Sequence, residues 1–302
     1  MKFFPRAFLF ALLLAGLAGC AVLGGRPAAP PVPAPLPPPA APPLKIGLAL
    51  GGGAARGFAH VGVIKALEAQ GIVPDIVVGT SAGAVVGALY AAGLSGFELQ
   101  KVALEMDERQ VGDWSLPDRG VFKGEALQNF VNKAVGQRPL EKLPRAFVAV
   151  ATDLKSGEPV IFRSGNTGMA VRASASVPGV FQPVNIGGRD YVDGGLVSPL
   201  PIHIARRLGA NFVIAVDISA KPQDANPSGI LNVLLQTFAI MGQTISRHET
   251  PDADVVIRPA TADLPATDFA GRHRAVLEGE KAAAAALAEL KGKLEKRRQP
   301  QP

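Results

Sequence analysis

The segment Gly79-Thr80-Ser81-Ala82-Gly83 places a serine between two glycines and is the part of this chain best suited to nucleophilic chemistry. The apolar run at 75–78 predicts a short buried strand, and the small residues at 82–92 predict a helix. A serine on a sharp turn from strand to helix is a nucleophile elbow, in which glycines relieve crowding and the hydroxyl projects beside the positive end of the helix. We therefore predict that Ser81 is a nucleophile, supported by Gly79 and Gly83.

A second glycine-rich segment, Gly51-Gly52-Gly53-Ala54-Ala55-Arg56-Gly57, joins an expected strand at 45–50 to an expected helix at 58–70. Consecutive glycines let backbone N–H groups point into a site, and the helix N-terminus adds positive potential, as an oxyanion hole requires. A phosphate-binding loop is one alternative, but the Lys-Ser/Thr of a Walker A sequence is missing and the glycine spacing differs from that of a dinucleotide fold. A purely structural turn is the other alternative.

The base that would activate Ser81 is marked less clearly. Asp193 lies in Tyr191-Val192-Asp193-Gly194-Gly195, where a strand is expected to meet a glycine turn that fixes the carboxylate. The same sequence is also typical of an ordinary turn. The order of serine, aspartate and histidine along the chain also permits a Ser-His-Asp triad. None of the four histidines lies in a distinctive motif; they are His60, His203, His248 and His273.

The elements that must position these residues alternate along the chain between strand-like and helix-like segments. This alternation predicts an α/β fold with a mostly parallel sheet covered by helices on both faces. Later strands are expected at 146–152, 159–162, 212–217 and 254–257, and later helices at 167–173, 201–208, 230–247 and 273–296. Ligands bind at the carboxyl ends of such strands, so the two glycine-rich motifs are expected to face one crevice.

Taken in order, these motifs resemble the patatin-like phospholipase family. That family's pattern is a glycine-rich loop followed by Arg or Lys and Gly, then G-x-S-x-G, then Asp-Gly-Gly or Asp-Gly-Ala. The segment Ala173–Pro178 also resembles the family's serine- and proline-containing block before the aspartate. The resemblance spans about residues 44–217 and implies a three-layer α/β/α patatin-like fold with a mostly parallel central sheet.

The resemblance further implies a catalytic dyad without histidine. Ser81 would attack an ester carbonyl, Asp193 would accept its proton, and water would release the acyl-enzyme. The oxyanion would be held by the N–H groups of Gly52, Gly53 and Ala54, with Arg56 supporting the loop or its charge. The remaining motif glycines would support these turns: Gly51, Gly57, Gly79, Gly83, Gly194 and Gly195. No metal and no other cofactor is expected.

The N-terminal residues 1–19 have the pattern of an export signal. A basic start with Lys2 and Arg6 precedes an apolar run that is too short to span a bilayer, and small residues lead to Cys20, the chain's only cysteine. This resembles the lipobox of bacterial lipoproteins, in which Cys20 is acylated; an ordinary cleaved signal is the alternative. In a cell with two membranes, Ala21 favours outer-membrane anchoring, facing the periplasm.

Composition then divides the rest of the chain. Residues 20–43 comprise the lipidated cysteine and a Pro/Ala-rich tether of polyproline II type, 44–294 are the expected hydrolase domain, and 295–302 are a basic tail. The net charge of +6 is concentrated outside the catalytic body. The tail is expected either to contact anionic lipid or to complement the helix dipole. Nucleic-acid binding is not expected in an exported protein with so short a basic cluster.

An exported lipoprotein works beside a membrane, so phospholipid or lysophospholipid acyl esters are the expected substrates. Trp114 is expected to be either an interfacial element or a core residue. Two other functions stay open: a Ser-His-Asp esterase acting on small or neutral esters, and a non-catalytic lipid-binding lipoprotein.

Overall fold

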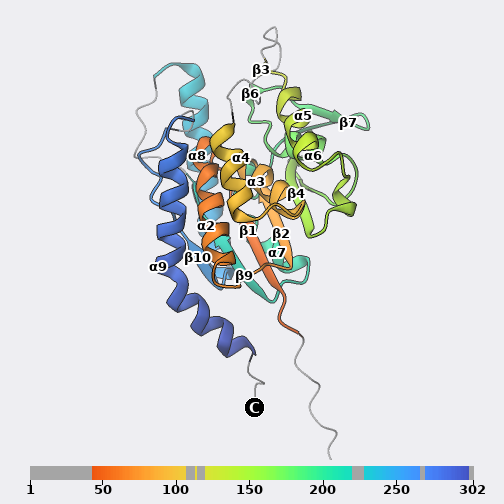
Figure 1. Ribbon diagram of the computed structural model, residues 1–302. Coiled ribbons are helices and arrows are strands. Elements are labelled where there is room, and N and C mark those ends of the chain that lie inside the picture. Colours follow the sequence, from red (N-terminus) through yellow and green to blue (C-terminus); the bar gives the residue numbers. More distant parts are fainter. Residues whose placement is uncertain (1–42, 107–112, 114–119, 220–227, 266–268, 299–302) are drawn as a thin grey trace, which may run out of the picture. The chain divides into compact units, whose positions relative to one another are not determined.

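The strands that lead to the glycine-rich loop and to Ser81 consist almost entirely of apolar residues and glycine. A computed structural model describes residues 43–106, 113, 120–219, 228–265 and 269–298, all within one structural unit (Figure 1). Every residue is buried in β1 (Ile46–Leu50), β2 (Ile76–Thr80) and β9 (Phe212–Val216). Continuous buried strands of this kind are typical of a parallel sheet that is covered on both faces.

These strands form the centre of an eight-stranded sheet. Together with β4 (Ala146–Asp153) and β10 (Val255–Ile257) they run parallel in the order β10-β9-β1-β2-β4. The register pairs Leu50 with Gly79, so the two glycine-rich motifs begin side by side at the carboxyl end of the sheet. Ile46 pairs with Phe212 at the opposite, amino end. The prediction of a mostly parallel sheet is confirmed.

The remaining strands of this sheet run antiparallel and extend it beyond β2. β5 (Pro159–Phe162) and β8 (Arg189–Asp193) pair with β4, and β7 (Val184–Ile186) pairs with β8. Three strands pair with β4. On β4, the partners of β2 end at Val150, those of β5 are residues 149–152, and those of β8 are residues 151–153. Because a strand has only two edges, β2 and β8 share one of them. The end of β8 at Asp193 therefore meets the end of β2, which immediately precedes Ser81.

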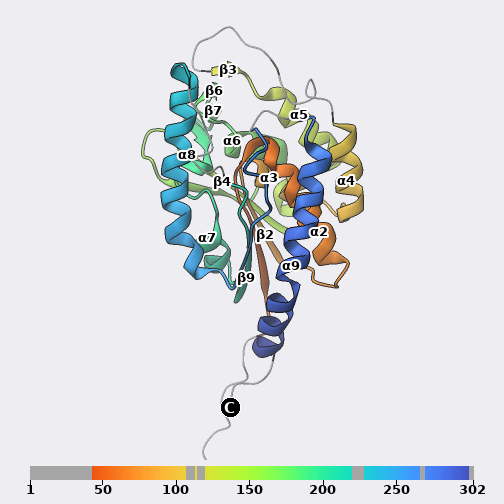
Figure 2. The same ribbon diagram turned by 90° about the vertical axis from the view of Figure 1, so that its left-hand side faces the viewer.

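Helices cover both faces of this sheet (Figure 2). On one face lie α2 (Phe58–Glu68), α3 (Ala82–Ala91), α4 (Gly96–Glu105) and α9 (Arg272–Arg298), and on the other lie α7 (Ile202–Arg207) and α8 (Ile230–Glu249). Leu48 and Val77 pack into the core of the first face, and Ala49 and Val78 into that of the second. The predicted three-layer α/β/α arrangement is confirmed.

Several shorter elements were not expected from the sequence. They are α4, α5 (Glu125–Ala134), β7, and a two-stranded parallel sheet of β3 (Gly120–Phe122) and β6 (Gly179–Phe181). α4 begins at a capping box between Ser95 and Glu98. α6 (Thr167–Ser174) packs against α5 and β4. α8 continues two residues beyond the expected Arg247 and ends at Glu249, which matters for the site.

Some predicted features lie outside the described residues: the signal segment, Cys20, the tether as far as residue 42, and Trp114. Among the helices that are described, none is long and apolar enough to cross a membrane. The described histidine and acidic side chains form no cluster suited to holding a metal ion.

Candidate active site

Ser81 lies on the predicted elbow between β2 and α3, in a strained backbone conformation. Its φ of 55° and ψ of −122° fall where residues other than glycine are rare, a cost of about 1–3 kcal/mol that is common at active sites. The neighbouring glycines are needed for space: a Cβ on Gly79 would lie 2.5 Å from the Cα of Ala84, and one on Gly83 would overlap the carbonyl of Leu50. The Ser81 side chain therefore sits at a turn that only this local sequence allows.

Asp193 ends β8 and is fully buried beside Ser81. Its Oδ1 accepts a hydrogen bond of 2.7 Å from the amide of Gly195. Its Oδ2 has no well-aligned hydrogen-bond partner among the described residues, although the Ser81 hydroxyl is close enough to lower the pKa of the carboxyl. Burial outweighs both hydrogen bonds and raises the pKa of Asp193 to about 7. A carboxylate with this pKa is a far better general base near neutral pH than an ordinary aspartate.

The serine-containing block after α6 holds the backbone of both residues. Ser174 Oγ accepts a hydrogen bond of 3.0 Å from the amide of Ser81 and donates one of 2.5 Å to the carbonyl of Val150. The carbonyl of Ser176 accepts a 2.9 Å hydrogen bond from the amide of Asp193. In the sequence, this block was identified only by its resemblance to the family, and its role in positioning Ser81 and Asp193 was not predicted. The Ser-x-Ser spacing was the local feature that could have indicated this role.

The glycine-rich loop approaches Ser81 but only part of it is available to an oxyanion. A Cβ on Gly52 would lie 3.3 Å from Ser81 Cβ, yet the amide of Gly52 donates a 2.9 Å hydrogen bond to the carbonyl of Pro199. The predicted donor set is therefore corrected: Gly52 is engaged elsewhere. The amides of Gly53 and Ala54 have no acceptor in the part of the chain that the structure describes. Ala54 also has a positive φ, of 51°.

Arg56, within this loop, and His60, on the helix after it, are both buried. Arg56 is buried, burial lowers the pKa of its guanidinium, and its Nε lacks an acceptor among the described residues. His60 is also fully buried, and burial lowers its pKa to about 4, so the ring is neutral. Its Nε2 lies 2.8 Å from the carbonyl of Gly51 and must donate there, since a carbonyl only accepts. His60 thus fixes the loop and does not act as a base.

The other three histidines have no described hydrogen bond to Ser81 or Asp193. His203 pairs with Asp252 at 3.2 Å, and both side chains are about half exposed. His248 and His273 are exposed on α8 and α9. No hydrogen bond described in this structure joins any histidine to Ser81 or Asp193, so the geometry favours a dyad over a Ser-His-Asp triad.

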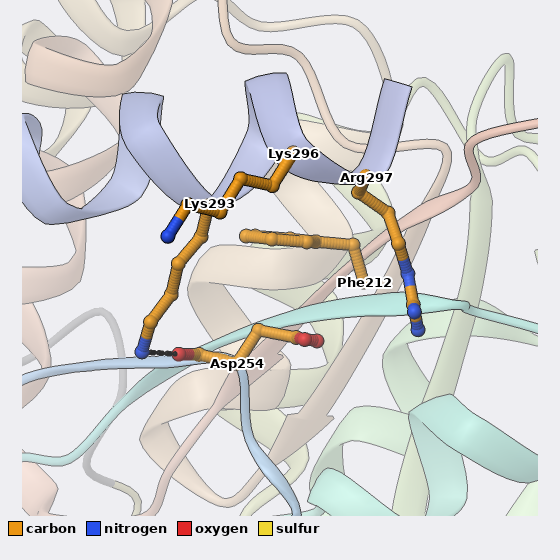
Figure 3. Close-up of a pocket in the computed structure, with 5 residues that line it drawn as sticks. All are labelled: Phe212, Asp254, Lys293, Lys296 and Arg297. Atoms are coloured by element: carbon orange, nitrogen blue, oxygen red, sulfur yellow. Dashed lines mark hydrogen bonds between the residues drawn. The ribbon is translucent and has the colours of Figure 1, made fainter. Parts of the chain in front are cut away.

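An open surface pocket lies at the amino end of the sheet (Figure 3). It has a volume of about 280 Å³ and is lined by Phe212, Asp254, Lys293, Lys296 and Arg297. Phe212 begins β9, so this pocket lies at the end of the sheet opposite to Ser81. Lys293 donates a 2.7 Å hydrogen bond to the carbonyl of Asp254, and Arg297 donates to the carbonyl of Asn211. This lining contains no serine or cysteine and neither Ser81 nor Asp193, so it does not match the expected ester-hydrolase site.

Comparison with known proteins agrees with the geometry at the carboxyl end. Residues 48–206 match the family model described as Patatin-like phospholipase, a segment that includes the glycine-rich loop, Ser81 and Asp193. The chain therefore belongs to the patatin-like phospholipase family. β9, α8, β10 and α9 follow the matched segment and complete the sheet and its helical layers.

The relatives are mostly longer proteins. An uncharacterized NTE family protein of Mycobacterium tuberculosis is 31% identical over 80% of this chain and 46% of its own length. The mouse patatin-like phospholipase domain-containing protein 6 is 34% identical over 59% of this chain and 14% of its own length. The chain thus spans about half, or less, of these relatives. Among solved structures, VipD from Legionella pneumophila aligns with a TM-score of 0.47 and 16% identity over 82% of this chain and 67% of that one.

Proposed function

We propose that this protein is a serine lipid acyl hydrolase, a carboxylic-ester hydrolase of phospholipase A or lysophospholipase type. The observation that carries the proposal is the meeting of the strained Ser81 elbow with the buried carboxyl of Asp193 at the carboxyl end of the sheet. Membership of the patatin-like phospholipase family supports lipid esters as the substrate class.

In the proposed reaction, Ser81 Oγ attacks the carbonyl carbon of an acyl ester while Asp193 accepts the hydroxyl proton. The negative charge on the carbonyl oxygen is stabilised by the amides of Gly53 and Ala54. The C–O bond to the alcohol then breaks, and Asp193 returns the proton to the departing lysolipid or glycerol oxygen. Water attacks the acyl-serine with Asp193 again as base, which releases the fatty acid and restores Ser81.

Burial explains how an aspartate performs this role without histidine. The closed environment raises the pKa of Asp193 to about 7, which strengthens it as a base, and the free amides nearby stabilise the developing charge. No hydrogen bond of good geometry satisfies Asp193 Oδ2 within the described structure, so this oxygen is available for the proton of Ser81.

The proposal is tested by measuring fatty acid release from phospholipid vesicles by the purified protein, Ser81→Ala and Asp193→Asn. Release by the parent and by neither variant supports the proposal. Matched controls are Ser156→Ala, an exposed serine, and Asp263→Asn, an exposed carboxylate; both should retain parental activity. Loss of activity in a histidine variant, comparable with that of Asp193→Asn, would instead favour the triad esterase, in which Asp193 would orient the histidine. A Ser81 that does not react with a fluorophosphonate would favour a non-catalytic lipid-binding protein.

We also propose that the protein acts at a membrane as a lipoprotein attached through Cys20 and exposed to the periplasm. This rests on the signal pattern and the single cysteine. Metabolic labelling with palmitate should mark the parent and not Cys20→Ser, which should also leave the membrane fraction. Equal labelling of both would overturn the proposed attachment.

A further inference from the structure

We infer that Glu249 is a positioning residue for the Ser81–Asp193 dyad, acting through Ser198 and Pro199; the inference rests on the proposed function. Glu249 is the last residue of α8, and its side chain is only 6% exposed. Its Oε1 accepts a 2.7 Å hydrogen bond from Ser198 Oγ. Neither the family resemblance nor any motif pointed to this carboxyl.

Ser198 and Pro199, named here the 198–199 bridge, contact all three motifs of the site. The amide of Ser198 donates to the carbonyl of Gly194 at 2.9 Å, in the turn after Asp193. The carbonyl of Ser198 accepts a 2.8 Å hydrogen bond from Thr80 Oγ1, next to Ser81. The carbonyl of Pro199 accepts from Gly52 at 2.9 Å, in the glycine-rich loop. A small shift of this bridge would therefore move nucleophile, base and oxyanion loop relative to one another.

Helix α8 closes over the bridge and the aspartate turn. A Cβ on Gly195 would lie 2.8 Å from the ring of Phe238, and one on Gly242 would lie 3.8 Å from Cβ of Pro199. These contacts are apolar and nondirectional. The hydrogen bond from Ser198 to Glu249 adds a directional link between the end of this helix and the bridge.

The carboxyl of Glu249 lies in a buried environment that disfavours its charged form. Its Oε2 is buried without a well-aligned hydrogen-bond partner among the described residues. Burial raises its pKa to about 7, opposed by the Ser198 hydroxyl and the amide of Leu200. Since a buried polar atom without a partner typically costs about 1–3 kcal/mol, a simple packing role would be served better by an apolar side chain.

The test separates hydrogen-bond positioning from packing. Glu249→Gln keeps an acceptor for Ser198 and should retain kcat within about threefold. Glu249→Leu and Ser198→Ala should each lower kcat about tenfold with KM unchanged, and the double variant should fall no further, since both remove one link. The rate at which a fluorophosphonate labels Ser81 should fall in parallel. Ser246→Ala, which removes a buried hydroxyl without a described partner one turn earlier on α8, is the matched control.

Independent, multiplying losses in the double variant, or unchanged kcat in Ser198→Ala, would overturn the inference. If Glu249→Leu does not fold, Glu249→Gln and Ser198→Ala still decide it. Failure of the proposed function is distinguishable: the parent protein would then be inactive on phospholipid vesicles and its Ser81 would not be labelled. A labelled parent whose labelling rate is insensitive to Ser198→Ala contradicts this inference alone.

Discussion

Among the described residues, polar groups at the amino end of the parallel sheet form hydrogen bonds and ion pairs, whereas several buried polar atoms near the carboxyl end have no described partner. At the amino end, Asp75 accepts a 2.6 Å hydrogen bond from the amide of Ile46, and Arg206 pairs with Asp254 at 2.6 Å. Near the carboxyl end, polar side-chain atoms without a described partner belong to Arg56, His60, Asp193 and Glu249.

The backbone shows the same contrast. The non-glycine residues with positive φ include Ala54 in the glycine-rich loop and Ser81 on the elbow, both at the carboxyl end. Strain and unsatisfied polar groups reduce stability and persist where surrounding structure imposes them, which makes them markers of function. At the carboxyl end, buried polar atoms without described partners and a strained backbone coincide with the candidate active site.

The largest expected effect comes from the dyad itself. Ser81→Ala should lower kcat by at least about 10⁴-fold, because it removes the nucleophile, and Asp193→Asn should come close to it. Both should fold, as judged by circular dichroism. Substantial activity in either variant, measured as fatty acid release, would contradict the assignment of catalysis to Ser81 and Asp193 at the carboxyl end of the sheet.

Asp193→Asn should also change stability in the opposite direction to activity. The pKa of Asp193 is about 7 when folded and 3.8 as its ordinary value, so the folded protein retains a proton that the unfolded chain loses between these pH values. Stability therefore falls as pH rises from about 4 to 7 and stays reduced above that, by on the order of a few kcal/mol. At pH 8 the variant should have the higher Tm, and at pH 4 the difference should shrink. A lower Tm at pH 8 would contradict a destabilising buried carboxylate.

The two serines of the block after α6 provide a matched pair. Ser174→Ala removes the acceptor for the Ser81 amide and should lower kcat about tenfold and stability by about 1–2 kcal/mol. Ser176→Ala leaves the backbone carbonyl that binds Asp193. The described hydrogen bond of the Ser176 hydroxyl goes to the carbonyl of Arg172, in the last turn of α6, so the effect should be smaller. Equal losses of kcat in steady-state assays would show that the site does not depend on these specific contacts.

Replacing the histidines should give graded, modest effects. His60→Phe removes the donor to Gly51 and should lower kcat about tenfold, while His60→Gln, which keeps a donor, should lose less. His203→Ala, His248→Ala and His273→Ala should retain nearly full activity. Loss of activity in any of these three, comparable with that of Asp193→Asn, would favour a triad.

The smallest effect is expected at the amino end. Lys293→Ala removes hydrogen bonds to Asp254 and Glu289 from a side chain that is 47% exposed, so stability should change by less than about 1 kcal/mol. Fatty acid release should be unchanged. A large loss of activity would instead indicate that the pocket in Figure 3, at the amino end of the sheet, takes part in the function.

The sequence predicted the parts of the site that depend on local structure. The apolar runs of β1 and β9 and the glycines around Ser81 act within a few residues, so their strand and elbow conformations follow from the sequence. α4 and α5 were missed although they are ordinary helices, and the antiparallel direction of β8 depends on how β4 extends past β2.

Contacts between distant segments could not be predicted in the same way. The engagement of the Gly52 amide depends on where Pro199 passes, and the contact between Ser198 and Glu249 joins residues 51 positions apart. Neither residue pair has a local pattern. The raised pKa of Asp193 likewise results from burial, which is a property of the assembled sheet and not of the Asp-Gly-Gly turn.

The central claim, that the buried carboxyl of Asp193 activates Ser81, is tested most directly by the pH dependence of Ser81 labelling with a fluorophosphonate. The account predicts that the labelling rate of the parent rises with pH through about 7, as Asp193 loses its proton, and that Asp193→Asn is labelled far more slowly at every pH. Equal labelling rates for the parent and Asp193→Asn would contradict the claim.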